Sequence, residues 1–315
     1  MSIKIELSTA CFTDKDYFKK IEECRKFIEG KGYRFGIQLH NSVTRKMYDE
    51  LKSLRVEFSI HAPVLSPYLL NLANDDFEDI NSGFQDTLKA MEELKAKITM
   101  FHGFFMTKKK IKNDPKNYTR LMSEAIDQEY RLGDTNVMDP KYFDTDEFKQ
   151  CQYNVKRNMN LLCDKYPQFI ICIENDFPGV GNGNQTPEQL IFLECPIWLD
   201  IGHLWAASIL HKFDFYEGIN KVCRNTKVAG VHLNTNQIGH DWDFKRGGDT
   251  HSRFSRVFEM DMDRIIHILK KNRVENYTME MIGGDINDVK FFIDAYEQHK
   301  FTTFCHSERS EESHI

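Results

Sequence analysis

The sequence lacks several features, and each absence narrows the class of protein. No apolar run approaches the ~20 residues that a membrane-spanning helix requires, so we expect no membrane partner. The first residues enter a strand-like run without the zones of a secretory signal, which predicts a cytoplasmic protein. The 8 cysteines show no paired close spacing, and we interpret them as reduced residues rather than disulfides or thiolate ligands.

An excess of positive charge is also missing. The 42 basic and 48 acidic residues give a net charge of -6, which does not favour nucleic-acid binding, although it leaves room for a local basic patch. No glycine-rich phosphate turn follows the first apolar run, where Ser8-Thr-Ala-Cys11 stands instead. This argues against a doubly wound nucleotide-binding sheet.

Strand-like and helix-like segments alternate along the chain. Strand patterns cover residues 3–7 and 33–39, and six further apolar runs end beside a histidine, aspartate or glutamate. Helical patterns cover 14–29, 42–54, 77–96, a helix from near 144, one from 186, then 205–222, 262–271 and 287–298. Such alternation requires parallel strands with helical crossovers, so we predict an α/β fold with a single (β/α)8 TIM barrel over residues 1–300.

Two segments exceed a minimal barrel. About forty residues, 106–143, follow the fourth strand and are far longer than an ordinary loop, which predicts an insertion after strand 4. Its basic first part, 107–120, is compatible with a solvated face and with a phosphate-contacting lid, and 123–130 has a helical pattern. Residues 301–315 are polar without periodicity and are predicted to form a disordered tail.

Nine side chains of metal-ligand type stand at the carboxyl ends of the predicted strands or in the loops just after them, where barrels place their active sites. Imidazole and carboxylate groups are the usual ligands of zinc, manganese and iron in such sites. The nine residues are His61, His102, Glu174, Asp200, His203, His232, Asp249, His251 and Glu280. Each alone has an ordinary structural explanation, but their joint placement predicts a metal centre.

Spacing adds detail to this prediction. Asp200 ends a strand and His203 follows three residues later, while Asp249 and His251 share one side of an extended segment because side chains alternate with period two. Each pair suits one ion. His40, at the end of the second strand, and His240, in the loop after the seventh, are candidate substrate or supporting groups, and for each of them the absence of any role is an equal alternative.

Short motifs surround the candidate ligands over about residues 57–284. They are His61-Ala-Pro, Tyr68-Leu-Leu-Asn-Leu-Ala73, His102-Gly, Ile173-Glu-Asn, Leu199-Asp-Ile-Gly-His203, Val231-His-Leu-Asn, Asp249-Thr-His251 and Met279-Glu280. With these motifs the chain resembles the xylose isomerase-like barrel superfamily, and in particular its endonuclease IV branch (AP endonuclease family 2). Four residues, Val64-Leu-Ser-Pro67, are inserted where that family's DNA-contacting loop lies.

The resemblance implies a phosphoester hydrolase that activates water with two or three divalent ions, zinc foremost and manganese or iron as alternatives. One ion would be held by His61, His102 and Glu174. Glu174 would bridge to a second ion held by Asp200, His232 and Glu280, and a third would be held by His203, Asp249 and His251. Glu174 and Glu280 are the expected catalytic residues, and the expected substrate-binding residues are His40, Tyr68, Asn71, His240 and Arg253.

Other functions stay open. Sugar and sugar-phosphate isomerases and epimerases of the same superfamily use one metal ion, held by residues that match Glu174, Asp200, His232 and Glu280, and two of those carboxylates move the substrate proton. A silent barrel or binding module, and metal chemistry such as iron-dependent oxidation, are further alternatives. The expected partner is therefore a small phosphorylated or sugar substrate or damaged DNA, and no oligomeric state is predicted.

Overall fold

The protein is described by a computed structural model for residues 2–13, 16–114, 116–244, 249–256 and 259–298. Eight parallel strands pair in sequence order, and β1 also pairs with β8, which closes the barrel. The strands are β1 Lys4–Ser8, β2 Arg34–Leu39, β3 Glu57–His61, β4 Ile98–Phe101, β5 Ile170–Glu174, β6 Ile197–Asp200, β7 Val228–Leu233 and β8 Asn276–Met279. The predicted (β/α)8 barrel is confirmed.

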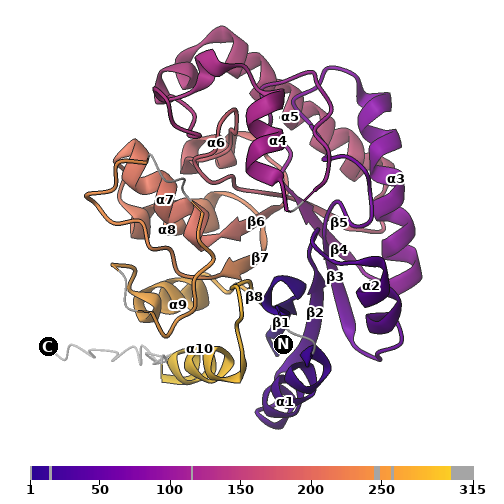
Figure 1. Cartoon of the computed structure of the whole chain (residues 1–315). Coiled ribbons are helices and arrows are strands. Elements are labelled where there is room, and N and C mark those ends of the chain that lie inside the picture. Colours follow the sequence, from indigo (N-terminus) through magenta and orange to yellow (C-terminus); the bar gives the residue numbers. More distant parts are fainter. Residues whose placement is uncertain (1, 14–15, 115, 245–248, 257–258, 299–315) are drawn as a thin grey trace, which may run out of the picture.

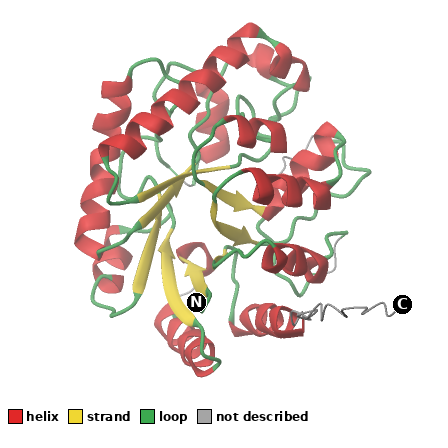
Figure 2. Ribbon diagram, turned by 180° about the vertical axis from the view of Figure 1, so that it is seen from behind, coloured by secondary structure: helices red, strands yellow, loops and turns green. Residues whose placement is uncertain are grey.

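Helices surround the strands (Figure 1 and Figure 2). The ten α-helices of the described residues are α1 Tyr17–Gly30, α2 Arg45–Leu51, α3 Phe77–Leu94, α4 Tyr118–Ala125, α5 Asp146–Lys165, α6 Pro187–Phe192, α7 Ile201–His211, α8 Phe215–Asn225, α9 Met262–Lys271 and α10 Ile286–Gln298. Local sequence sets their starts. Thr186 caps α6 through a reciprocal pair with Gln189, with Pro187 in the first turn, as the Thr-Pro-Glu sequence predicts.

Two helix predictions need correction. The expected helix over 205–222 is two helices, because Lys212 adopts a left-handed conformation (φ 58°) that ends α7, and the Asp214 carboxylate then caps α8 at the Glu217 N–H. Apolar periodicity runs across this break and hides it. The pattern over 123–130 also misplaces its helix, which lies at Tyr118–Ala125 and is followed by a 3-10 turn at Gln128–Tyr130.

The segment between β4 and α5 carries α4 and ends in a 3-10 turn at Pro140–Asp144. Its path brings α4 next to the carboxyl end of the barrel (Figure 1), where Tyr118 lines a cavity together with strand-end residues. The predicted tail over 301–315 lies outside the described residues.

One side of the barrel interior, at β4, β5 and β6, has an apolar floor below the strand ends. Side chains alternate along a strand, so Trp198 shares the inner face with Asp200, and Cys172 shares it with Glu174. The Trp198 ring lies 5.7 Å from the His232 ring. The floor consists of Ile98, Met100, Cys172 and Trp198, all of which are buried.

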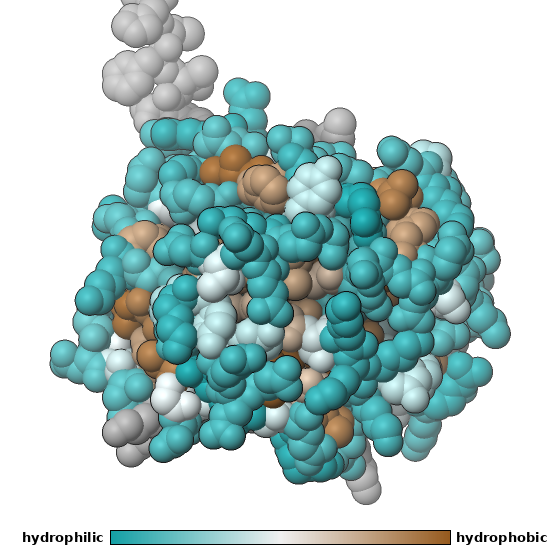
Figure 3. Space-filling model, turned by 90° about the horizontal axis from the view of Figure 1, so that it is seen from above, coloured by the Kyte–Doolittle hydropathy of each residue, from teal (hydrophilic) through white to brown (hydrophobic). Residues whose placement is uncertain are grey.

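The outer surface is largely hydrophilic on the face seen from above, with hydrophobic side chains in small separate patches (Figure 3). No helix in the described ranges is long and apolar enough to cross a membrane. The cysteines in these ranges carry free thiols, in agreement with the interpretation from their spacing.

Candidate metal centre

All nine predicted ligands lie around the carboxyl end of the barrel. Register explains part of this convergence, because Asp200 on β6 is the direct partner of His232 on β7. Three groups have ligand atoms that all lie within 4.8 Å of one another. They are His61 with Glu174, His232 and Glu280; His102 with Glu174 and His203; and Asp200 with His203 and His251.

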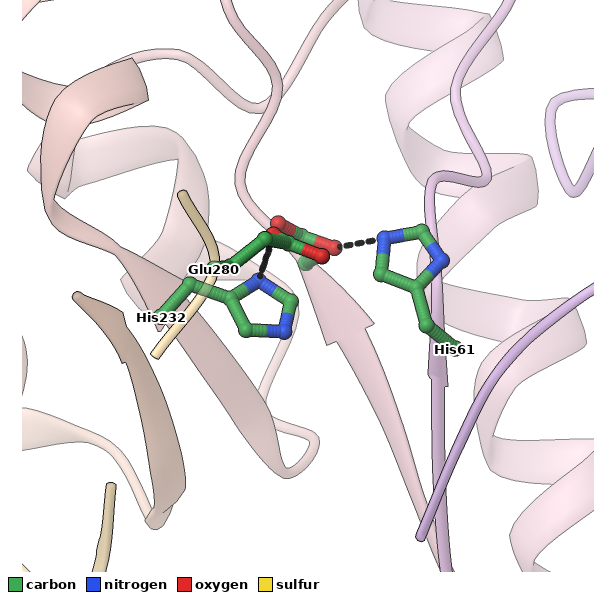
Figure 4. Close-up of side chains that lie close together, drawn as sticks. His61, His232 and Glu280 are labelled. Carbon is green, nitrogen blue, oxygen red and sulfur yellow. Dashed lines mark hydrogen bonds and ion pairs between the residues drawn. The ribbon is translucent and has the colours of Figure 1, made fainter. Parts of the chain in front are cut away.

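The first group is the most deeply buried. His61 and His232 lie on opposite sides of the carboxylates (Figure 4). The His61 Nε2 atom is 2.8 Å from Glu174 Oε2. The His232 Nδ1 atom is 2.7 Å from Glu174 Oε1 and 3.0 Å from Glu280 Oε2. Two imidazoles and two carboxylates thus face one point.

Glu174 also belongs to the second group. Its Oε2 atom lies 3.6 Å from His102 Nε2, and its Oε1 atom lies 3.7 Å from His203 Nδ1. This central place among four imidazoles is the position that a bridging carboxylate requires. The structure groups His61 with His232 and Glu280, whereas the resemblance assigns His61 and His102 to one ion, so the division of ligands among ions stays a prediction.

His251 of the third group lies on a loop, and Asp249 on the same loop approaches this group. Asp249 Oδ2 is 2.9 Å from His251 Nε2 and 3.6 Å from His203 Nε2. His251 has a left-handed backbone (φ 36°), a costly conformation for a residue with a β-carbon. Its Nδ1 atom lies 3.0 Å from the Glu280 carbonyl oxygen, which fixes the ring. Backbone strain at this residue is typical of a functional position.

Supporting residues fix the imidazoles, as is usual for metal-ligating histidines. Asp176 Oδ1 lies 3.0 Å from His102 Nδ1, and Gln38 Oε1 lies 2.8 Å from His232 Nε2. Neither residue is among those predicted from the sequence. Asp176 had a weak signal, since it stands two residues after Glu174 and so on the same side of the chain. Gln38 had none, because an amide is not a usual metal ligand.

Several buried polar atoms of the cluster lack hydrogen bonds, which tests whether the residues fit a metal. Glu174 Oε2 and His203 Nε2 are fully buried without a hydrogen-bond partner among the described residues. Glu174 Oε2 nevertheless lies 2.8 Å from His61 Nε2, at the distance of an ion pair but without a hydrogen bond. A shared cation satisfies both atoms. The donor set therefore fits zinc, manganese or iron.

The charges of the cluster are strongly interdependent. Burial opposes ionisation of Glu174, but the imidazoles around it, His232 foremost, outweigh burial and hold the pKa of its carboxyl well below its usual range. Burial likewise opposes the charged form of His203, yet the carboxylates of Asp200 and Asp249 raise the pKa of that imidazole to about 10. The pocket thus strongly favours positive charge among its carboxylates.

A cavity of about 230 Å³ opens onto this cluster. Its walls include His40, whose ring centroid lies 5.0 Å from that of His61 and whose Nδ1 atom is 2.7 Å from Ser42 Oγ. Burial lowers the pKa of His40 to about 3. The other lining residues are Ala10, Asn41, His61, His102, Tyr118, Phe177, Asp249, His251, Glu280 and Ile282.

The other four predicted substrate residues do not line this cavity. Tyr68 is 43% exposed and lies at a neighbouring groove. The nitrogen and the oxygen of the Asn71 side-chain amide both form hydrogen bonds with backbone atoms of nearby loops. His240 pairs with Glu259 on the surface. Arg253 pairs with Asp285 and Asp288.

Comparisons with solved structures agree on the barrel fold. No family model and no curated protein matches the sequence. A solved D-tagatose 3-epimerase-like protein matches with a TM-score of 0.60 and 15% identity, over 94% of this chain and 97% of that one. The IOLI protein with a bound zinc atom matches with a TM-score of 0.56 and 13% identity, over 95% of this chain and 100% of that one.

An endonuclease IV from Thermus thermophilus also matches, with a TM-score of 0.49 and 13% identity, over 95% of this chain and 98% of that one. The chain has the fold of the xylose isomerase-like barrels, as the motifs predicted. Likeness at such low identity shows the fold alone and singles out no branch of the superfamily.

Proposed function

We propose that this chain is a metal-dependent hydrolase of phosphoester bonds, of endonuclease IV-like type, with two or three divalent ions and zinc as the proposed metal. The observation that carries the proposal is a further set of ligand side chains, namely His203, Asp249 and His251. A single ion needs no more than the first group, which is His61, Glu174, His232 and Glu280. Asp249 Oδ2 adds a further carboxylate between the His203 and His251 rings. Sites with two or more ions are typical of phosphoryl chemistry.

The proposed reaction converts a phosphoester and water into an alcohol and a phosphate. The water oxygen forms a bond to phosphorus, the bond from phosphorus to the alkoxy oxygen breaks, and one water proton ends on the released alcohol. When bound, the ions supply a lowered water pKa and neutralise the phosphoryl oxygens. Glu174 lies against His61 of the first group and His102 of the second, and would keep the two groups at a fixed separation. Asp176 and Gln38 hold His102 and His232 in orientation.

Sugar isomerisation or epimerisation with a single ion is the second candidate. One specific observation favours it, the approach of Glu174 and Glu280 to the same His232 nitrogen at 2.7 and 3.0 Å. Two carboxylates this close can take a proton from, and return it to, the carbon beside a carbonyl. In that reaction the loop ligands Asp249 and His251 have no assigned task.

Metal content tests the proposal directly. We expect the purified, metal-loaded chain to hold two or three ions by elemental analysis, and Glu174→Gln to lose them together because this carboxylate touches both ligand sets. The matched control is Glu23→Gln, since Glu23 is a half-exposed residue on α1 (52%) and its change leaves the metal content intact. A stable stoichiometry of one ion per chain would contradict the multi-ion hydrolase.

Activity assays separate the two candidates. The loaded chain is incubated with bis(4-nitrophenyl) phosphate, with a duplex oligonucleotide that carries one abasic site, and with a ketose. Release of nitrophenol or cleavage of the duplex, lost in Glu174→Gln and kept in Glu23→Gln, supports the hydrolase. Epimer formation from the ketose without phosphoester cleavage supports the isomerase instead.

A further inference from the structure

Two aromatic side chains form part of the cavity wall. Tyr118, the first residue of α4, and Phe177, three residues after the end of β5, both line the cavity. Their ring centroids are 6.4 Å apart. The Phe177 ring lies 5.4 Å from the His203 ring and 6.3 Å from the His102 ring. Phe177 therefore packs directly beside two of the predicted ligands.

Tyr118 presents a polar group to the ligand cluster. Among the residues that the structure describes, its hydroxyl has no hydrogen-bond partner, although the side chain is half-buried. Tyr118 lines the same cavity as Asp249 and His251. A tyrosine hydroxyl at this place is a ready hydrogen-bond donor.

Positive side chains are missing from the same cavity. Among the described residues that line it there is no lysine or arginine. The basic residues Lys108 and Lys109 of the segment after β4 line other grooves, and Lys110 pairs with Asp79. Proteins hold a DNA backbone chiefly through lysine and arginine contacts to successive phosphates. The walls of this cavity provide none.

The size of the cavity points the same way. Its volume of about 230 Å³ is smaller than the roughly 300–1,000 Å³ of ordinary small-molecule pockets. Tyr118 of α4 reaches the cavity wall from the segment between β4 and α5, which is far longer than a typical connection. A compact molecule fits between the aromatic wall and the ligands.

We propose that the substrate is a small phosphoester rather than a DNA strand, and that Tyr118 and Phe177 select it. The Tyr118 hydroxyl donates a hydrogen bond to a phosphoryl oxygen, and the Phe177 ring packs against the organic group. Both are substrate-binding residues, and this assignment rests on the proposed hydrolase function. The segment between β4 and α5 therefore has a role in specificity through the residue at which α4 begins.

Binding provides a test that does not depend on turnover. Calorimetric titration of the metal-loaded protein uses phenylphosphonate, which is not hydrolysed, and a duplex with one abasic site. We expect the phosphonate to bind and the duplex to bind at least tenfold more weakly. Tyr118→Phe should weaken phosphonate binding roughly tenfold, as expected for loss of one hydrogen bond to a charged group. Tyr153→Phe is the matched control, because Tyr153 is 58% exposed on α5.

Hydrolysis of two substrates distinguishes the possible failures. We expect cleavage of 4-nitrophenyl phosphate or bis(4-nitrophenyl) phosphate and none of the abasic duplex, with Phe177→Leu raising KM and Phe192→Leu, at a 39% exposed position on α6, leaving it unchanged. Efficient cleavage of the duplex, or wild-type phosphonate binding by Tyr118→Phe, overturns the inference but leaves the hydrolase standing. Cleavage of neither class by a fully loaded protein overturns the hydrolase itself and the inference with it.

Discussion

The Asp176 carboxylate lies 3.0 Å from His102 Nδ1 and is itself fully buried. This contact turns the other ring nitrogen of His102 toward Glu174, at 3.6 Å from Oε2. Burial raises the pKa of Asp176 to about 6, and the hydrogen bond from His102 opposes that rise. We interpret Asp176 as a positioning residue, because this buried carboxylate lies beside a candidate ligand and orients the His102 ring.

Removal of Asp176 should weaken metal binding without a change in fold. We expect Asp176→Ala to lower metal affinity about 10- to 100-fold, and Asp176→Asn to lower it less because the amide oxygen still accepts the His102 proton. Competition with a chromophoric chelator measures both. Asp49→Asn serves as control because Asp49 is 61% exposed on α2. Equal affinity in Asp176→Ala and the wild type would show that His102 needs no such support.

Metal removal should destabilise the barrel. Buried carboxylates converge at its carboxyl end, and an ion that binds the folded state alone stabilises it by about 2.7 kcal/mol at a concentration 100 times its Kd. For a chain of this size, a loss of that order lowers Tm by about 4 °C. Thermal scans before and after treatment with a chelator measure the change. Added zinc should restore Tm in the wild type and not in Glu174→Gln; identical scans with and without chelator would speak against a bound ion.

Asn71 should matter for stability rather than for substrate. Its Nδ2 atom donates to the Phe105 and Thr107 carbonyl oxygens at 3.0 and 2.6 Å, and its Oδ1 accepts from Phe105 N and Ala73 N. Asn71→Ala removes these four hydrogen bonds, so we expect a loss of about 1–3 kcal/mol and faster proteolysis after β4, with metal content unchanged. Asn225→Ala, at the end of α8, is the control. A rise in KM without loss of stability would support the role predicted from the sequence.

Gly230 on β7 tests the packing beneath the site. A β-carbon at this position would lie 2.3 Å from Trp198 Cη2, and Trp198 is fully buried in the barrel floor. Gly230→Ala should therefore cost about 1–3 kcal/mol by overpacking. Gly30→Ala introduces the same methyl group where no heavy atom lies within 4 Å, and should change stability little. Urea denaturation compares the two; equal midpoints would show that the floor can adapt.

The fold could be predicted because the strands are continuous buried runs, such as β5 with Ile171, Cys172 and Ile173 all buried. Strand ends fix the direction of a side chain, so residues such as Glu174 and Asp200 could be placed without coordinates. Loop residues are different. Nothing local in the sequence shows that Tyr118 lines the site, because that depends on how a long connection folds over the barrel.

The place of the predicted substrate residues away from the cavity has a similar physical cause. Arg253 stands near His251 in sequence, yet ion pairs with Asp285 and Asp288 commit its guanidinium to the neighbouring α10 region. Long-range ion pairs of this kind leave no local pattern. The same is true of Gln38, which contacts a histidine 194 positions away along the chain.

Gln38 gives the sharpest test of the His232 orientation. Its Oε1 atom lies 2.8 Å from His232 Nε2, and its Nε2 atom donates to Thr278 Oγ1 at 3.3 Å, so the amide has one possible orientation. The proton of His232 is thereby held on Nε2, which leaves Nδ1 as the ligand atom toward Glu174. Gln38→Met removes the acceptor at similar volume and should lower metal affinity about 10-fold or more.

Gln38→Glu keeps an acceptor at the same place and should retain more affinity than Gln38→Met, although its added negative charge shifts the metal preference. Proton NMR of the histidine ring resonances in the diamagnetic zinc-loaded protein follows the Nε2 proton of His232 directly. We expect a slowly exchanging proton in the wild type and in Gln38→Glu, and its loss in Gln38→Met. If Gln38→Met kept both that proton and full metal affinity, the packing of His232 against Trp198 would suffice to orient it, and Gln38 would have no part in the site.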